Sequence, residues 1–213
     1  MNDKLSGLYA ITTDHHSDTA QLRADVEAAL NGGARIIQYR NKSDDTLRRR
    51  DEARALRDLC TAFGVPLIVN DDLELAVAVN ADGVHIGRDD GDLTNVRTHL
   101  GAGRLVGVSC YNDFDLARHA VAGGADYIAF GSFFASPTKP HAVVATPSLL
   151  RRARTELHVP VVAIGGISPE NGAALVRDGA DMLAVISAVF NADDIIAAAR
   201  AFAPCFDTAE ETS

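Results

Sequence analysis

Pro66-Leu67-Ile68-Val69-Asn70-Asp71-Asp72 is a short apolar run that ends abruptly in an amide and two carboxylates. An apolar run of this length without alternation is typical of a strand buried on both faces of a parallel sheet. Carboxylates are costly to bury unpaired, so polar residues at the end of such a strand indicate contact with solvent, a ligand or a metal. We therefore expect the functional site at the carboxyl ends of the strands.

Similar runs recur along the whole sequence. Eight can be marked: Leu8–Thr12, Ile36–Arg40, Leu67–Asn70, Gly83–Gly87, Leu105–Ser109, Tyr127–Gly131, Val161–Gly165 and Leu183–Ser187. Segments with helical length and period lie between them, which predicts parallel strands joined by helices. Eight such units predict a single α/β domain over residues 1–213, a closed (β/α)8 TIM barrel. An open six-stranded, doubly wound sheet is the alternative.

A turn motif stands just before each even-numbered run. It reads Asn31-Gly32-Gly33-Ala34, Asn80-Ala81-Asp82-Gly83, Gly123-Gly124-Ala125-Asp126 and Asp178-Gly179-Ala180-Asp181. Glycine after a helix closes it in the left-handed conformation, so each copy predicts a helix-to-strand turn. A repeat every two units favours the barrel.

Composition narrows the class of protein. The sequence has 213 residues and a net charge of −9. A protein this acidic lacks the excess of basic residues that binding to nucleic acid or to an anionic membrane requires. Three cysteines without ligand spacing argue against a disulfide framework or a zinc site. No apolar stretch is long enough to span a bilayer and no signal core opens the sequence, so we expect a cytoplasmic protein. Residues 204–213 are predicted to be a polar, disordered tail.

Charged residues gather after several predicted strands. Arg40, Lys42 and Lys139 are suited to a polyphosphate, and the carboxylates that follow the third and fourth strands are suited to Mg²⁺. An aspartate directly after a strand can instead cap the next helix. The run of arginines between Arg48 and Arg54 is interpreted as a solvated helix face.

Gly165-Gly166, together with Ser187 on the next strand, is the pattern of a phosphate grip after strands seven and eight. The alternative is a tight turn without a ligand. The loop after the sixth strand adds Ser136, Thr138 and Lys139 as further donors. His85 is interpreted as a hydrogen-bonded structural histidine and Cys110 as a packing residue.

Taken in order, these strand-end motifs resemble the thiamine phosphate synthase family over almost the whole sequence. The resemblance rests on Gln38-Tyr39-Arg40-Asn41-Lys42, Asn70-Asp71, Asp82-Gly83-Val84-His85-Ile86-Gly87 with Asp90, Ser109, Ser136-Pro137-Thr138-Lys139, Ala163-Ile164-Gly165-Gly166-Ile167 and Ile186-Ser187. It implies a Mg²⁺-dependent transferase that joins 4-amino-2-methyl-5-hydroxymethylpyrimidine diphosphate to thiazole (carboxy)ethyl phosphate. The products would be thiamine phosphate and pyrophosphate. The resemblance leaves the oligomeric state open, and a homo-oligomer is one of the alternatives.

The resemblance also implies residue roles. The pyrimidine diphosphate would be held by Gln38, Tyr39, Arg40, Asn41, Lys42, Asn70, Ser109 and Lys139, of which Arg40, Lys42, Ser109 and Lys139 would be catalytic. The thiazole phosphate would be held by Ser136, Pro137, Thr138, Gly166, Ile186 and Ser187. Asp71 and Asp90 would bind Mg²⁺.

The implied mechanism is dissociative: pyrophosphate leaves a pyrimidine carbocation, which the thiazole nitrogen then attacks. It needs neutralised leaving-group charge and no protein nucleophile, and the strand ends offer that chemistry. The sequence departs from the usual family pattern at Arg88, at Cys110-Tyr111, and at Ser132, Ala135 and Ser136 in the loop after strand six. A thiazole tautomerase of the same superfamily and a non-catalytic sensor of thiamine-pathway phosphates are the alternative functions.

Overall fold

A closed barrel of parallel strands forms the centre of the molecule. The structure is a computed structural model and describes residues 5–14, 16–87, 93–135 and 144–207. All eight predicted strands are present, and each pairs with its sequence neighbours until β8 closes on β1. They are β1 (Gly7–Ile11), β2 (Ile36–Tyr39), β3 (Leu67–Asn70), β4 (Gly83–Ile86), β5 (Leu105–Tyr111), β6 (Tyr127–Gly131), β7 (Val161–Ile164) and β8 (Met182–Val185).

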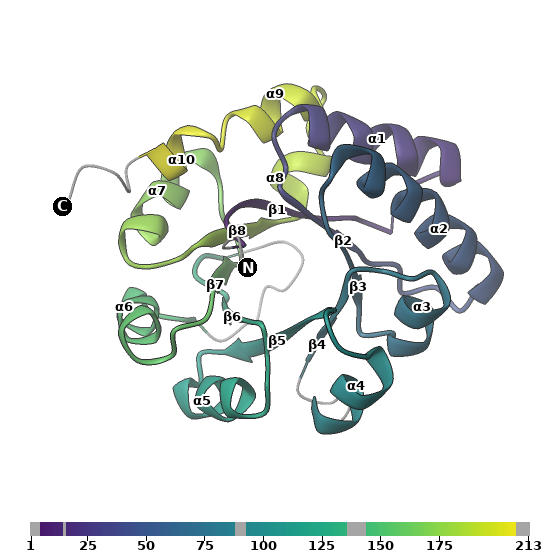
Figure 1. Ribbon diagram of the computed structural model, residues 1–213. Helices are drawn as coiled ribbons and strands as arrows, with labels where there is room; N and C mark the ends of the chain where they lie inside the picture. Colours follow the sequence, from purple (N-terminus) through teal and green to yellow (C-terminus); the bar gives the residue numbers. More distant parts are fainter. Residues whose placement is uncertain (1–4, 15, 88–92, 136–143, 208–213) are drawn as a thin grey trace.

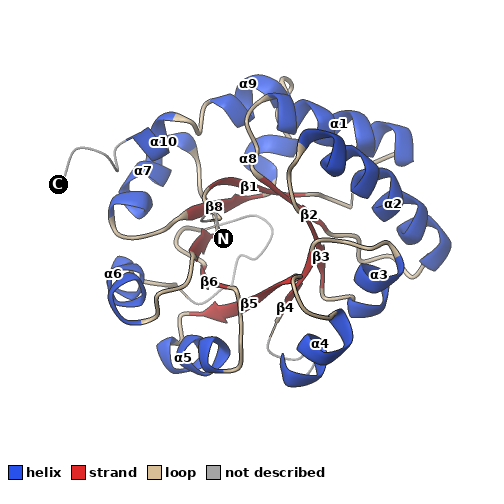
Figure 2. Ribbon diagram, in the orientation of Figure 1, coloured by secondary structure: helices blue, strands red, loops and turns tan. Residues whose placement is uncertain are grey.

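Helices surround the barrel as an outer ring (Figures 1 and 2). They are α1 (Thr19–Asn31), α2 (Thr46–Phe63), α3 (Leu73–Ala78), α4 (Leu93–Leu100), α5 (Phe114–Ala122), α6 (Pro147–Glu156), α7 (Pro169–Arg177), α8 (Ser187–Phe190), α9 (Ile195–Arg200) and α10 (Pro204–Asp207). Asp45 caps α2, and α7 begins at Pro169 after Ser168. Within the described residues, none of these helices has the length and apolar character needed to cross a membrane.

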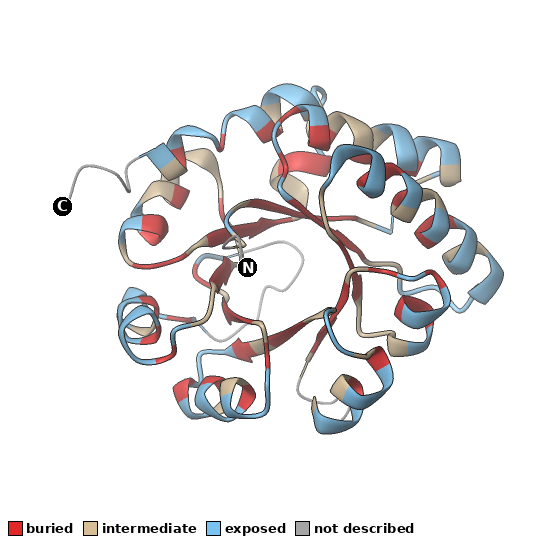
Figure 3. Ribbon diagram, in the orientation of Figure 1, coloured by how far each residue is buried: buried red, intermediate tan, exposed pale blue. Residues whose placement is uncertain are grey.

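Two apolar layers lie on the two faces of the sheet. The larger cluster packs the outward side chains of the strands against the helices, and it includes Ile37, Leu67 and Leu56. The smaller cluster fills the barrel interior with alternate strand residues such as Tyr9, Ile68 and Tyr127. Figure 3 shows the consequence: strands are mostly buried, whereas helices alternate between buried and exposed residues.

The repeated turn motif has a structural role at the amino-terminal ends of the strands. Asp82, Asp126 and Asp181 stand before β4, β6 and β8, and each carboxylate accepts a backbone N–H from the first or second residue of the preceding strand at 2.7–2.9 Å. Arg57 also pairs with Asp82, and Arg97 with Asp126. The predicted helix-to-strand turn is thus confirmed. We call Asp82, Asp126 and Asp181 the entry aspartates, because each stands where the chain enters a strand and joins that strand to its neighbour.

Three expectations need correction. Ser187 was expected at the end of the last strand, but β8 ends at Val185 and Ser187 begins helix α8. The predicted tail is ordered at its start, because residues 204–207 form α10 and Cys205 is buried beside α7, where its thiol donates to the carbonyl of Pro169. Arg48 and Arg49 are not simply solvated, since Arg48 pairs with Glu52 and Arg49 with Asp72.

Candidate active site

The end of β2 directs alternate side chains to opposite faces of the sheet. Gln38 points into the barrel, where its amide nitrogen donates to the hydroxyl of Tyr9 at 2.7 Å. Tyr39 points outward, and its hydroxyl donates to Glu52 on α2 at 2.7 Å. The amide of Asn41 donates to the same carboxylate oxygen at 2.8 Å. The expectation that the side chains of Tyr39 and Asn41 hold a ligand is therefore not supported by their placement.

Glu52 is a buried carboxylate that supports this segment and that the sequence analysis missed. Its side chain is 2% exposed and also accepts from Nε of Arg48 at 2.7 Å. Burial acts to raise the pKa of Glu52, but the hydrogen bonds from Tyr39, Arg48 and Asn41 outweigh it and hold the pKa below its usual value. The available signal was a carboxylate on the buried stripe of an otherwise amphipathic helix, next to Ala53 and Leu56.

Two cations extend from the segment that follows β2. The guanidinium of Arg40 lies 3.1 Å from the carboxylate of Asp14, and the ammonium of Lys42 pairs with Asp71. Asp14 also accepts the backbone N–H of Lys42 at 3.2 Å, and Thr12 accepts that of Arg40 at 2.9 Å. The loop after β1 therefore positions both predicted phosphate-binding cations, a contribution of Asp14 that the sequence analysis also missed.

Two aspartates, Asp71 and Asp72, follow β3, and their carboxylates have different roles. Asp72 caps α3 by accepting the N–H of Leu75 at 2.8 Å, and it pairs with Arg49. Asp71 has a φ of 61° and donates its backbone N–H to the carbonyl of His85 at 2.8 Å. Its side chain accepts from Lys42 and, at 2.7 Å, from the amide of Asn70. The helix-cap alternative therefore applies to Asp72, whereas Asp71 lies at the mouth of the barrel.

Asp71 and Asn70 offer the chemistry that Mg²⁺ requires. Both can supply oxygen ligands, and the Asp71 side chain is 26% exposed, so a hydrated ion can approach it. The ammonium of Lys42 shows that this carboxylate already binds a positive charge. Within the described residues no group of three or more candidate ligands occurs, and the second predicted ligand, Asp90, lies outside them together with Arg88. The residues present fit a metal held mainly by substrate and water oxygens.

Ser109 lies near the end of β5, and its hydroxyl is 2.9 Å from Nε2 of His85. His85 is 8% exposed, and its Nδ1 lies 3.2 Å from the hydroxyl of Tyr127. The prediction of a hydrogen-bonded histidine is therefore confirmed. Cys110 is buried, which raises the pKa of its thiol to about 12 and agrees with a packing role. His16 pairs with Asp25 at 3.1 Å.

The Gly165-Gly166 turn is held against the segment that follows β6. The two φ angles are 103° and 63°, and a Cβ at Gly165 would lie 1.9 Å from the hydroxyl of Ser132. At Gly166 a Cβ would lie 2.5 Å from the carbonyl of Ala135. Glycine is thus required here by backbone conformation and packing alone. Binding of phosphate at Gly166, Ile186 and Ser187 stays a prediction, and Ser136, Pro137, Thr138 and Lys139 lie outside the described residues.

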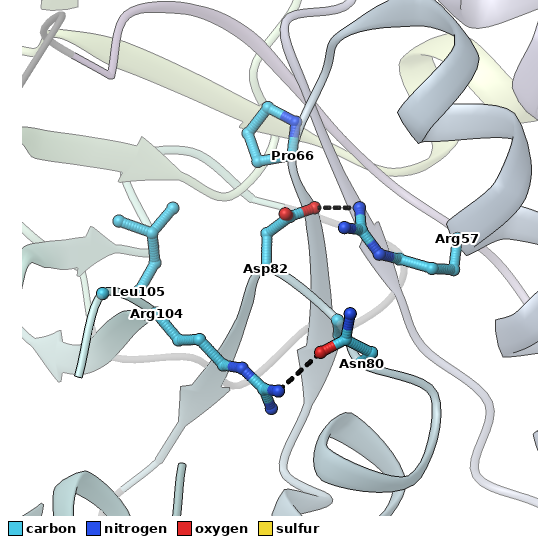
Figure 4. A pocket seen from close by; sticks show the side chains of 8 residues that line it. Arg57, Pro66, Asn80, Asp82, Arg104 and Leu105 are labelled. Atoms are coloured by element: carbon cyan, nitrogen blue, oxygen red, sulfur yellow. Dashed lines mark hydrogen bonds and ion pairs between the residues drawn. The ribbon is translucent and has the colours of Figure 1, made fainter. Parts of the chain in front are cut away.

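A separate hollow lies at the opposite end of the strands. It is lined by residues that precede β3, β4 and β5, together with Arg57 of α2 (Figure 4). Its two arginines are already engaged, because Arg57 donates to Asp82 at 2.7 Å and Arg104 to Asn80 at 2.6 Å. The residues that line this hollow therefore stabilise the amino-terminal ends of the strands, and we do not expect them to take part in catalysis.

Fold and mouth together define the class of protein. A parallel barrel whose carboxyl-terminal rim gathers Arg40, Lys42, Asp71 and Ser109 is an enzyme of the (β/α)8 class with a site for an anionic substrate.

Comparison with known proteins identifies the family within that class. The model of the thiamine monophosphate synthase family matches residues 8–189, and this chain belongs to that family. A thiamine-phosphate synthase from Azoarcus sp. is 53% identical over 97% of this chain and 100% of the relative. One from Thiobacillus denitrificans is 54% identical over 91% of each chain. The solved thiamine phosphate pyrophosphorylase from Pyrococcus furiosus has a TM-score of 0.83 and 32% identity, covering 95% of this chain and 96% of its own.

Proposed function

We propose that this protein is a thiamine phosphate synthase, a transferase that moves the pyrimidine methylene group from pyrophosphate to the thiazole nitrogen. In this reaction the bond from carbon to the diphosphate oxygen breaks with its electron pair on oxygen. The nitrogen lone pair of the thiazole then forms the new bond to carbon. The observation that carries the proposal is the clustering of Arg40, Lys42 and Asp71 at one rim of a family barrel.

The pyrimidine diphosphate would be bound from the described side of the mouth by Gln38, Arg40, Lys42, Asn70 and Ser109, with Lys139 as a further cation. Tyr39 and Asn41 would act through Glu52, which braces the segment that carries Arg40 and Lys42. Fixed positive charges next to the leaving group stabilise the developing pyrophosphate without reorganisation. The thiazole phosphate would be bound by Ser136, Pro137, Thr138, Gly166, Ile186 and Ser187.

Magnesium dependence is general among thiamine phosphate synthases, and we propose that Asp71 and Asp90 provide the protein carboxylates. When bound there, Mg²⁺ would supply further neutralisation of diphosphate charge. Lys42 would then turn from Asp71 to a phosphate oxygen, since both the metal and the ammonium compete for the same carboxylate. The cytoplasmic location remains a prediction from the sequence.

The test is release of pyrophosphate with both substrates present, with each omitted in turn, and with Mg²⁺ removed by chelation. We expect release only when both substrates and the metal are present. Isomerisation of a thiazole phosphate without pyrophosphate release would instead identify a tautomerase. Binding of either phosphate without any turnover would identify a sensor.

Asp71→Ala tests the metal assignment in the same assay. Loss of the carboxylate should reduce turnover by about a hundredfold or more, because one preorganised charge contact in an active site is worth about 3 kcal/mol. Asp115→Ala is the matched control, since Asp115 forms an exposed pair with Arg118 on α5. A near wild-type rate for Asp71→Ala at ordinary Mg²⁺ would refute the ligand role of Asp71.

A further inference from the structure

A continuous line of hydrogen bonds crosses the inside of the barrel below the mouth. The amide nitrogen of Gln38 lies 2.7 Å from the hydroxyl of Tyr9, which lies 2.9 Å from that of Tyr127. The hydroxyl of Tyr127 lies 3.2 Å from Nδ1 of His85, and Nε2 of His85 lies 2.9 Å from the hydroxyl of Ser109. We call these side chains, from β2, β1, β6, β4 and β5, the interior network.

The interior network is buried except at its last member. Tyr9, Gln38, Tyr127 and His85 are 1%, 3%, 1% and 8% exposed, whereas Ser109 is partly exposed. His85 stacks on Tyr127 with ring centroids 5.6 Å apart and an interplanar angle of 24°. Space for Tyr127 depends on Gly107 of β5, where a Cβ would lie 2.0 Å from the tyrosine ring. The packing therefore fixes the order of the groups along the network.

The first donor sets the direction of all the protons. An amide nitrogen can only donate, so the oxygen of Tyr9 accepts from Gln38. The hydroxyl proton of Tyr9 is buried and needs an acceptor, which the oxygen of Tyr127 provides. Tyr127 then gives its proton to Nδ1 of His85, which must be unprotonated. A neutral imidazole in that state carries its proton on Nε2 and donates to Ser109.

We infer that His85 is a positioning residue, held as the Nε2–H tautomer by the interior network so that Ser109 presents its hydroxyl proton to the mouth. The oxygen of Ser109 accepts from His85, which leaves its own proton for an acceptor atom of the bound substrate. This inference rests on the proposed function, where the acceptor is a ring nitrogen of the pyrimidine or an oxygen of its diphosphate. The placement of the ring supports the neutral state, because it is buried inside the barrel with a hydroxyl within hydrogen-bond distance of each nitrogen.

The direct test is ¹⁵N NMR of the free enzyme with labelled histidine, which distinguishes the two neutral tautomers. The sequence has seven histidines, and the signal of His85 is assigned by its loss in His85→Gln. We expect a single Nε2–H tautomer. Tyr127→Phe should raise the Nδ1–H population, because it removes the donor that holds Nδ1 unprotonated. Tyr39→Phe, which removes a buried hydroxyl on the other face of the sheet, should leave the His85 signal unchanged.

Two substitutions at His85 separate positioning from packing. His85→Gln can still donate an amide N–H toward Ser109, whereas His85→Glu, when ionised, can only accept. We expect kcat to fall by about tenfold or more in His85→Glu, with a much smaller loss in His85→Gln and little change in KM for the thiazole phosphate. Thermal unfolding of both variants establishes that they are folded before rates are compared.

An Nδ1–H tautomer in the wild-type enzyme would overturn the inference, because Nδ1 would then donate to Tyr127 and Nε2 would accept the proton of Ser109, which could no longer be presented to the mouth. Equal loss of kcat in the folded Gln and Glu variants would also overturn it, since only a structural role would remain. The tautomer is measured without substrate, so it stands or falls independently of turnover. Absence of pyrophosphate release by the wild-type enzyme would contradict the proposed function and leave the tautomer result intact.

Discussion

Alternation along β2 decides which neighbouring side chains can reach a ligand. Gln38 contacts Tyr9 inside the barrel, while Tyr39 contacts Glu52 on the helical side. Burial and the neighbouring Glu52 carboxylate both raise the pKa of Tyr39, so its hydroxyl stays protonated and donates to that carboxylate. Neighbouring side chains of this segment therefore face opposite sides of the sheet, and only Gln38 points into the barrel.

His85 makes folding stability depend on pH in a definite direction. Burial lowers its pKa to about 4, with the carboxylate of Asp71 acting in the opposite sense, whereas its ordinary pKa is 6.5. Between these values the unfolded chain binds a proton that the folded barrel does not. The stabilising effect of a neutral His85 is therefore complete above pH 6.5 and is lost as the pH falls toward 4.

We expect this one residue to account for up to about 3 kcal/mol of lost unfolding free energy across that range. The measurement is urea unfolding of the wild type and of His85→Gln at several pH values between 7 and about 4. Carboxylates common to both proteins cancel in the comparison, so the wild type should lose stability more steeply than the variant. Parallel pH profiles would show that His85 is not held neutral by burial.

At the scale of secondary-structure elements, the entry aspartates tie the barrel together at its amino-terminal end. Asp126 precedes β6, yet its carboxylate accepts the N–H of Val106 at the start of β5 at 2.7 Å and pairs with Arg97 of α4 at 2.5 Å. One side chain thus connects two strands and a helix. Arg35 occupies the corresponding place before β2. Its backbone N–H donates to the carbonyl of Leu8, as that of Asp126 does to Val106, but an arginine side chain cannot accept a strand N–H.

Asp126→Ala should lower the unfolding free energy by about 1–3 kcal/mol, because it leaves the N–H of the buried Val106 and the guanidinium of Arg97 without their acceptor. Asp126→Asn should cost less, since its amide oxygen can still accept from Val106. Urea unfolding of both variants is the measurement, with Asp115→Ala as the control for an exposed ion pair. If Asp126→Ala and the control were equally stable, the entry aspartate would have no role in joining strands.

Element order and the gathering of polar side chains after the strands could be predicted from the sequence, because apolar period and strand-end polarity are local patterns. The eight strands and the caps at Asp45 and Ser168 belong to this class. Contacts between distant elements could not be predicted. Glu52 with Tyr39, Asp14 with Arg40, and Tyr9 with Tyr127 each join different strands or helices, so no spacing in the sequence reveals them.

At the scale of the whole molecule, the two ends of the barrel present cations in different electrostatic settings. At the mouth, Lys42 pairs with Asp71, a carboxylate that a metal can take over. At the opposite end, Arg57 pairs with Asp82, which is also bonded to the N–H of Leu67 and so is fixed in the entry turn (Figure 4). Only the mouth can release its cation to a phosphate without breaking a strand entry.

Pyrophosphate with Mg²⁺ should therefore stabilise the protein through the mouth alone. At about 100 times its Kd a ligand adds about 2.7 kcal/mol, which raises the Tm of a domain of this size by about 5–10 °C. Calorimetry or thermal unfolding should show this shift with both components, and little of it with pyrophosphate after chelation. Lys42→Ala should lose most of the shift, whereas Arg104→Ala, the control at the opposite hollow, should retain it. If Arg104→Ala lost the shift and Lys42→Ala retained it, the anion would bind at the amino-terminal end of the strands. The mouth would then not be the anion site.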